Sequence, residues 1–177
     1  MKIKKRFYFS LVGEFGLGKS KTYEMLRTFA KELDNIQVVA ISGRNAKMKR
    51  SFEYLVEQEH KEDCIKVLDY TTKVPELMSI SDLVVTKPGG LTTSESLASG
   101  LPIIVINPIP GQEEENAAFL EDKGVAIWIK KQESSKQILQ NLFSSPEQMQ
   151  KMKVNARLLA KKNSCKDICE ILLHNSF

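Results

Sequence analysis

A glycine-rich turn that leads into a helix is the segment of the sequence best suited to bind a charged ligand. Residues 86–95 read TKPGGLTTSE, in which two adjacent glycines allow a tight turn and a close approach of a ligand to the backbone. The amides from Gly90 to Thr93 would point out of the helix start, where backbone N–H groups bind anions such as a diphosphate. The alternative is a capping box between Thr92 and Glu95, which stabilises a helix without any ligand.

A second polar segment follows the next predicted strand. Residues 107–117 read NPIPGQEEENA, and the two prolines fix how the chain approaches a helix. Gln112 and Glu113 stand at the helix start, where their amide and carboxylate groups suit the hydroxyls of a sugar lying across the sheet edge. Consecutive glutamates also complement the positive end of a helix dipole, and for Glu114 and Glu115 we prefer that interpretation.

A third segment resembles the phosphate-binding loop of nucleotidases. Residues 13–20 read GEFGLGKS and satisfy G-x-x-x-x-G-K-[ST] between a predicted strand and a predicted helix. An ATPase or kinase also needs an acidic residue at the end of a neighbouring strand to help hold magnesium. Asp69 is the best candidate, because Asp82 stands before its strand. The chain offers no other nucleotidase machinery, so we prefer a glycine-rich turn here.

The elements that position these segments alternate along the chain. Short apolar runs predict strands at 7–12, 36–41, 64–68, 83–86, 103–106 and 125–129. Helical periodicity occupies 19–33, 46–59, 74–80, 92–99 and 112–123, and a helical tail from about 133 adds 135–143, 146–162 and 166–173. Apolar strands separated by helices predict a Rossmann-like α/β fold, a doubly wound parallel sheet of about six strands. Ligands bind at the carboxyl ends of the strands in such folds.

Length, charge and composition indicate one compact domain over residues 1–177, because neither a composition shift nor a linker divides the chain. The net charge is +4. Nucleic acid is disfavoured as a partner because no clustered aromatic side chains accompany the basic residues. A peripheral contact with an anionic membrane stays open, but no apolar run approaches the roughly 20 residues that span a bilayer.

Cysteine and histidine usage argues against a metal site. The chain has three cysteines, Cys64, Cys165 and Cys169, and this odd number suits a protein of the reducing cytoplasm. We expect the protein either free in the cytoplasm or at the inner face of the cell membrane. Neither His60 nor His174 lies at metal-ligand spacing from these cysteines. We therefore expect no metal and no cofactor.

Residues 7–130 resemble the C-terminal donor domain of family 28 glycosyltransferases, in particular the bacterial processive diacylglycerol glucosyltransferases and the monogalactosyldiacylglycerol synthases. The resemblance rests on KPGGLTTSE at 87–95 and PIPGQEEENA at 108–117, with SGRN at 42–45 as a weaker match. It implies that the chain is the C-terminal half of a glycosyltransferase B (GT-B) fold and that its substrate is a UDP-sugar.

The resemblance also implies roles for the matching residues. The turn from Gly89 to Thr93 would bind the UDP diphosphate, Glu95 the ribose hydroxyls, and Gln112 and Glu113 the hydroxyls of the transferred sugar. The glycine-rich loop at the start of the chain would then be the family's loop between two domains, without a need for ATP. The expected donor-binding set is Gly13, Gly16, Ser42, Gly43, Gly89, Gly90, Leu91, Thr92, Thr93, Glu95, Gln112, Glu113 and Asn116.

The implied function is the inverting transfer of a hexose from UDP to a lipid acceptor such as diacylglycerol, without a metal. Glucose or galactose is expected before N-acetylglucosamine. We expect the acceptor domain and the catalytic base outside this chain, so the chain alone should bind donor and show almost no transfer. Two alternatives stay open: a P-loop phosphotransferase that uses residues 13–20, and a non-catalytic subunit that binds a UDP-sugar.

Overall fold

Six strands and eight helices alternate in the part of the chain that the computed structural model describes, residues 5–10, 21–33 and 36–174, with side chains described from residue 21 onward. The strands are β1 Lys5–Ser10, β2 Ile36–Ile41, β3 Ile65–Leu68, β4 Leu83–Thr86, β5 Ile103–Val105 and β6 Ala126–Trp128. The helices are α1 Lys21–Glu32, α2 Ala46–Gln58, α3 Val74–Ser79, α4 Gly90–Ala98, α5 Gln112–Asp122, α6 Ser135–Ser144, α7 Pro146–Leu159 and α8 Ser164–His174. The predicted elements are thus confirmed, but β1, α4 and α8 each start two residues earlier than expected and α7 ends three residues earlier. The predicted strand residues 11–12 and helix residues 19–20 lie outside the described residues.

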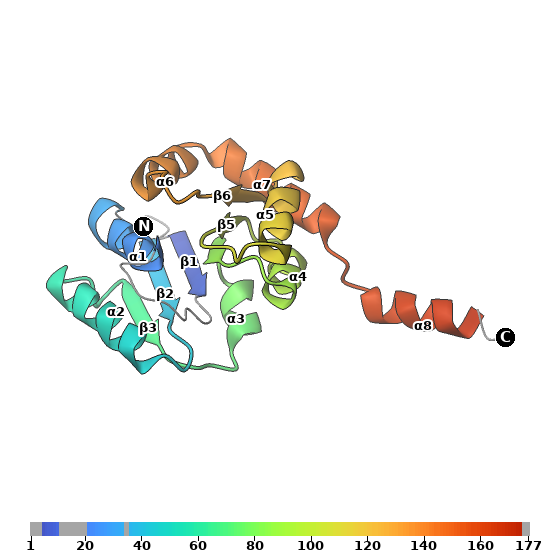
Figure 1. Cartoon of the computed structure of the whole chain (residues 1–177), viewed down its shortest axis with the longest axis horizontal. Coiled ribbons are helices and arrows are strands. Elements are labelled where there is room, and N and C mark those ends of the chain that lie inside the picture. Colours follow the sequence, from blue (N-terminus) through green and yellow to red (C-terminus); the bar gives the residue numbers. More distant parts are fainter. Residues whose placement is uncertain (1–4, 11–20, 34–35, 175–177) are drawn as a thin grey trace.

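The strands form one parallel sheet in the order β3-β2-β1-β4-β5-β6. The chain starts in the middle of the sheet, builds outward to β3, and then crosses to β4 on the other side of β1 (Figure 1). The predicted doubly wound fold is confirmed. Its direction of winding reverses between β1 and β4, and ligands bind at such a switch point in open α/β sheets.

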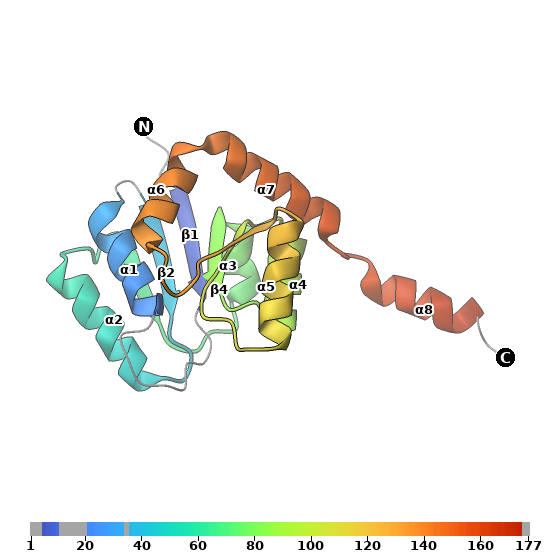
Figure 2. The same ribbon diagram turned by 45° about the horizontal axis from the view of Figure 1, so that its top comes forward.

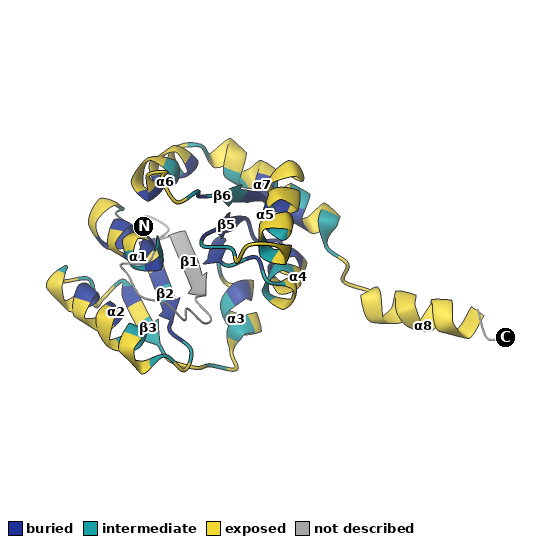
Figure 3. Cartoon of the chain, in the orientation of Figure 1, coloured by how far each residue is buried: buried dark blue, intermediate teal, exposed yellow. Residues whose placement is uncertain are grey.

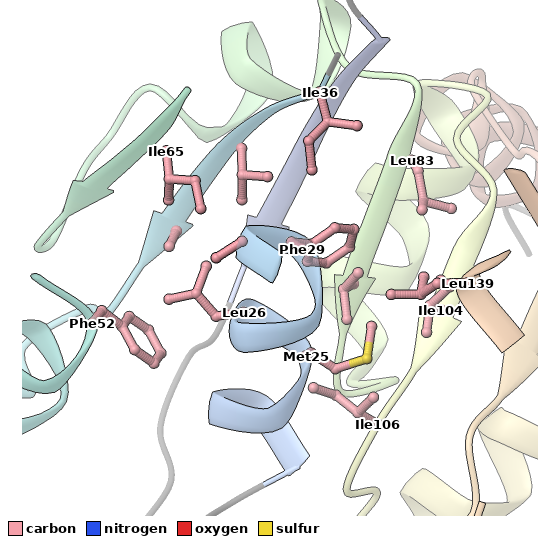
Figure 4. Packing of buried hydrophobic residues seen from close by; sticks show 14 of the residues in the cluster. Met25, Leu26, Phe29, Ile36, Phe52, Ile65, Leu83, Ile104, Ile106 and Leu139 are labelled. Carbon is pink, nitrogen blue, oxygen red and sulfur yellow. The ribbon is translucent and has the colours of Figure 1, made fainter. Parts of the chain in front are cut away.

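Helices cover both faces of the sheet because successive strand side chains point to opposite faces. On one face, Phe29 of α1, Phe52 of α2 and Leu139 of α6 join one buried cluster, part of which Figure 4 shows. On the other face, α3, α4 and α5 contribute to a second cluster. Within β5, Ile104 belongs to the first cluster, whereas both of its neighbours belong to the second. The sheet is therefore buried on both faces, as its continuous apolar strands require.

A carboxylate joins α1 to α6. Glu24 accepts hydrogen bonds from the Ser135 hydroxyl at 2.6 Å and from the Lys21 ammonium at 3.0 Å. Partial burial tends to raise the pKa of Glu24, but these hydrogen bonds outweigh that effect and the pKa lies below its ordinary value. The ionised carboxylate therefore helps to hold α6 on the first face of the sheet.

The two last helices differ in how they contact the domain. α7 packs on it through Met152 and Ala156, and the Lys153 ammonium lies 2.8 Å from the Asp82 carboxylate at the start of β4. α8 extends away from the domain (Figures 1 and 2), and every one of its residues is exposed (Figure 3). None of the helices that the structure describes is both long enough and apolar enough to traverse a bilayer.

Candidate functional site

The loops that follow β4 and β5 lie side by side at the carboxyl edge of the sheet. The Ile106 amide, just past β5, donates to the Thr86 carbonyl at the end of β4 at 3.1 Å. The first loop runs directly into α4 and the second into α5. Both polar segments that the sequence singles out therefore meet at one place, next to the switch point between β1 and β4.

The start of α4 leaves three backbone amides without a hydrogen bond to any described residue. Gly89 is the N-cap, with φ −69° and ψ 151° and no side-chain cap, and the Thr93 amide donates to its carbonyl at 2.9 Å. The amides of Gly90, Leu91 and Thr92 have no partner among the residues described, as is usual for the first positions of an uncapped helix. Such amides attract an anion because they also carry the positive end of the helix dipole.

Two expectations for this turn are wrong. The capping box does not form, because Thr92 is the third residue inside α4 and cannot serve as its cap. If Thr92 were the cap, α4 would begin at Thr93 and would lack its first three residues, Gly90 to Thr92. The Thr93 amide is also not available to a ligand, since it bonds to Gly89 within the helix. The amides that a ligand could reach at this helix start are therefore those of Gly90, Leu91 and Thr92, one fewer than the sequence indicated.

Other groups near the start of α4 have no partner in the described part of the chain. Among the described residues, the buried Thr93 hydroxyl has no hydrogen bond, and the exposed Glu95 side chain has neither a hydrogen bond nor an ion pair. Lys87, directly before the turn, is half-buried and makes no ion pair there. Sequence reasoning left Lys87 out of the donor-binding set, although a cation next to an anion-binding turn was a usable signal.

The first turn of α5 holds both loops. Its N-cap, Gly111, has φ 95°, a conformation that side chains rarely adopt. The Glu113 carboxylate accepts a hydrogen bond from the Ile109 amide at 2.7 Å, and the Asn116 side-chain amide donates to the Pro88 carbonyl at 2.9 Å. Gln112 is exposed and its side chain makes no hydrogen bond with the residues described. The contact from Asn116 across to Pro88 is one that the sequence pattern did not predict.

The loop after β2 carries the SGRN match. The Ser42 side chain is buried, and its hydroxyl donates to the Leu68 carbonyl at 3.1 Å, which ties β2 to β3. Gly43 follows with φ 59°, the left-handed region that favours glycine. The guanidinium of Arg44 lies 5.3 Å from the centre of the exposed Tyr70 ring. The Ser42 side chain therefore stabilises the loop after β2, and Gly43 lies in that loop at the carboxyl edge of the sheet.

The phosphate-loop motif falls where the structure gives no description. Gly13 and Gly16, with the rest of 13–20, lie outside the described residues. The acid proposed to accompany that motif, Asp69, does lie at the end of β3, but its carboxylate pairs with the Lys49 ammonium at 3.1 Å. β3 is also the outermost strand, two strand spacings or roughly 10 Å from β1. Within the described ranges, no three His, Cys, Asp or Glu residues are grouped to hold a metal.

Comparison with known proteins gives the same fold and a family. The structure of Phytolacca americana UGT2, complexed with UDP-2fluoro-glucose and pterostilbene, matches 98% of this chain and 42% of that chain with a TM-score of 0.73 at 14% identity. This match confirms the expected half of a GT-B fold.

Sequence comparison identifies closer relatives. The processive diacylglycerol beta-glucosyltransferase of Bacillus pumilus (strain SAFR-032) is 40% identical over 141 residues, which cover 80% of this chain and 36% of the relative. The protein of the same name from Bacillus subtilis (strain 168) is 36% identical over 172 residues, 97% of this chain and 44% of the relative. The chain thus spans about two-fifths of the length of these relatives. The model of the glycosyltransferase family 28 C-terminal domain matches residues 20–172, and the chain belongs to that family.

Proposed function

We propose that this chain binds the UDP-sugar donor of a hexosyltransferase whose acceptor is a lipid such as diacylglycerol. The observation that carries the proposal is the uncapped start of α4 at the switch point of the sheet. The amides of Gly90, Leu91 and Thr92 there make no hydrogen bond within the described ranges. A diphosphate bound there would accept hydrogen bonds from those amides. The names of the relatives, which are glucosyltransferases acting on diacylglycerol, support the same chemistry.

The residues around this turn suit the remaining parts of the donor. Lys87 would add a positive charge beside the diphosphate, and the Glu95 carboxylate, which pairs with none of the described residues, would accept hydrogen bonds from the ribose hydroxyls. Gln112 projects from the neighbouring helix start, where it would meet the hexose. Ser42, Gly43, Gly13 and Gly16 complete the proposed donor set, and the last two lie outside the described residues.

In the transfer step, the amides at the start of α4 would stabilise the negative charge that develops on the departing UDP. An acceptor hydroxyl attacks the anomeric carbon while the bond from that carbon to the β-phosphate oxygen breaks, and UDP departs with the added negative charge. Amides that already face the diphosphate stabilise this charge without reorganising, which is the main source of electrostatic catalysis. We propose that the base which removes the hydroxyl proton, and the acceptor site, lie in the part of the relatives that this chain does not cover, together with any peripheral membrane contact.

Calorimetric titration with UDP, UDP-glucose, UDP-galactose, UDP-N-acetylglucosamine and ATP with magnesium tests the proposal. We expect UDP to bind without a divalent cation, the matching UDP-sugar to bind more tightly than UDP, and ATP not to bind. Magnesium-dependent binding of ATP without binding of UDP would overturn the proposal in favour of a phosphotransferase. A transfer assay should then show turnover only when the acceptor-binding half of a family member is supplied. Binding without turnover under those conditions would indicate a non-catalytic subunit.

A further inference from the structure

The helix α8 carries two of the three cysteines of the chain, Cys165 and Cys169, about one turn apart. Both thiols are free and exposed. Residues four apart lie on one face of a helix, with about 5 to 6 Å between their Cβ atoms. The third cysteine, Cys64, directly precedes β3 in the body of the domain, whereas α8 extends away from it (Figure 1). The two thiols of α8 are therefore placed to react with one another rather than with Cys64.

A disulfide between the two cysteines and the helix exclude one another. A disulfide brings its two Cβ atoms to within about 3.5 to 4.5 Å of each other, which is closer than the helix allows. The chain between Cys165 and Cys169 would have to leave its helical dihedral angles, and the helical hydrogen bond from the Cys169 amide to the Cys165 carbonyl would break. Closing the disulfide therefore unwinds the first part of α8.

Little opposes such a change in α8. All 11 of its residues are exposed, and neither of the described buried clusters includes any of them. The ion pair between Lys166 and Glu170, at 3.6 Å, lies within the helix, and an exposed pair of this kind adds little stability. Unwinding α8 therefore costs only the small free energy of a short exposed helix and leaves the core of the domain intact.

The surroundings of Cys165 suit an anionic oxidant. Lys161 and Lys162 are exposed and precede the helix, and Lys166 follows Cys165 directly. Clustered positive charge raises the local concentration of anions. Glutathione disulfide is an anion of this kind, and it represents the class of small disulfides that oxidise protein thiols by exchange.

The exchange balances in two steps. The thiolate of one cysteine attacks a sulfur of glutathione disulfide, whose S–S bond breaks, and one glutathione leaves as the thiol with the proton of that cysteine. The thiolate of the second cysteine then attacks the protein sulfur of the mixed disulfide and releases the second glutathione, which takes the second proton. Two protein thiols are thus oxidised to one disulfide while one glutathione disulfide is reduced to two thiols.

We infer that Cys165 and Cys169 form a redox switch that decides whether α8 is helical. The segment forms the helix while both side chains are thiols, and it forms a disulfide-closed loop once they are oxidised. The inference goes beyond donor binding and does not depend on it. Because the two states exclude one another, a substitution that weakens the helix must favour the disulfide.

Helix propensity at Ile168, which lies between the cysteines and is 57% exposed, provides the test. Ile168→Gly and Ile168→Ala differ in helix propensity by the equivalent of about fivefold in an equilibrium constant. The 177-residue chain is equilibrated with glutathione and glutathione disulfide, and mass spectrometry of its alkylated peptides gives the fraction with the Cys165–Cys169 disulfide. The equilibrium constant for this disulfide should be higher in Ile168→Gly than in Ile168→Ala by up to about fivefold, with the wild type between them.

Two controls separate the helix from other effects. In concentrated guanidinium chloride, where no helix remains, the difference between Ile168→Gly and Ile168→Ala should disappear. Circular dichroism gives an independent readout: oxidation of the wild type by glutathione disulfide should lower the helical signal, and dithiothreitol should restore it. The Cys169→Ser variant, which cannot close the disulfide, should show neither change.

Three results would contradict the inference. Equal equilibrium constants for Ile168→Gly and Ile168→Ala in native buffer would show that the helix does not oppose the disulfide. A wild-type chain that forms no Cys165–Cys169 disulfide, or that keeps its full helical signal when this disulfide is closed, would show that the pair is not a switch. The same loss of signal in Cys169→Ser would exclude the disulfide as its cause.

Discussion

Replacing Gly90 by proline should make the domain more stable while weakening its binding of UDP. Gly90 is the first residue of α4, a position where proline is favoured because its fixed φ suits the helix and the missing N–H has no helical partner. The preceding Gly89 is extended, with φ −69° and ψ 151°, which is the conformation that a following proline requires. Nothing lies within 4 Å of a Cβ built at Gly90. The substitution therefore fits the unliganded backbone.

The expected magnitudes have opposite signs. Restricting the unfolded chain should add about 0.4 to 1 kcal/mol to the free energy of unfolding, or up to about 4 °C in melting temperature for a domain of this size. Removing one of the three amides that we propose to bind the diphosphate should cost about 1.5 to 3 kcal/mol of binding, or about 10- to 150-fold in the dissociation constant for UDP. The proline ring also occupies the space of the lost N–H, which favours the upper part of that range.

Gly90→Ala is the matched control, because it restricts the unfolded chain in the same way and keeps the N–H. It should raise the melting temperature and leave UDP affinity within about threefold of the wild type. Calorimetric titration and thermal unfolding of the three proteins give both quantities. A folded Gly90→Pro variant that binds UDP as tightly as Gly90→Ala would refute the assignment of these amides to the diphosphate.

Five further substitutions, one of them a control, test other parts of the structure. Glu95→Ala should weaken UDP by about 1 to 3 kcal/mol as a charged acceptor is removed, and unchanged calorimetric affinity would leave Glu95 an ordinary surface residue. Gln112→Ala should leave UDP unaffected and cost roughly 1 kcal/mol of the additional affinity for UDP-glucose; equal losses for both ligands would point to a distorted loop. Phe29→Ala should lower the urea-derived free energy of unfolding by about 3 to 5 kcal/mol, whereas Leu158→Ala at an exposed position should change it by less than about 0.5 kcal/mol. Ionised Glu24 stabilises the fold fully above its ordinary pKa of 4.5, and this stabilisation is lost as the pH falls through the lowered pKa of the folded state. Glu24→Gln should therefore flatten the decline in melting temperature at acid pH. Parallel plots of melting temperature against pH for the two proteins would contradict that role.

The sequence predicted the sheet because its signal is local. A strand such as β4, with every residue buried, reads as a continuous apolar run, and the alternation of such runs with helices leaves few topologies open. The proximity of the loops after β4 and β5 could also be predicted, because parallel strands have their carboxyl ends at the same edge of the sheet.

The details at that edge could not be read in the same way. The spacing of Thr92 and Glu95 satisfies a capping pattern, yet α4 begins earlier, at Gly90. Its N-cap Gly89 has no side chain, so no capping residue in the sequence marks this start. The contact between Asn116 and Pro88 joins residues 28 apart in the sequence. It depends on the pairing of β4 with β5 and on the rotation of α5, neither of which a sequence pattern specifies.

The exposed state of α8 has a consequence for how this segment acquires its structure. An isolated helix of 11 residues is marginal in water, because nucleation is costly and packing provides most helical stability in proteins. Ile168, Ile171, Leu172 and Leu173 are 57% to 73% exposed, so little burial offsets the entropy of ordering the backbone. Folding of α8 is therefore coupled to its burial: the segment should gain helix content and lose thiol reactivity at Cys165 and Cys169 together, whenever another surface covers its apolar side chains.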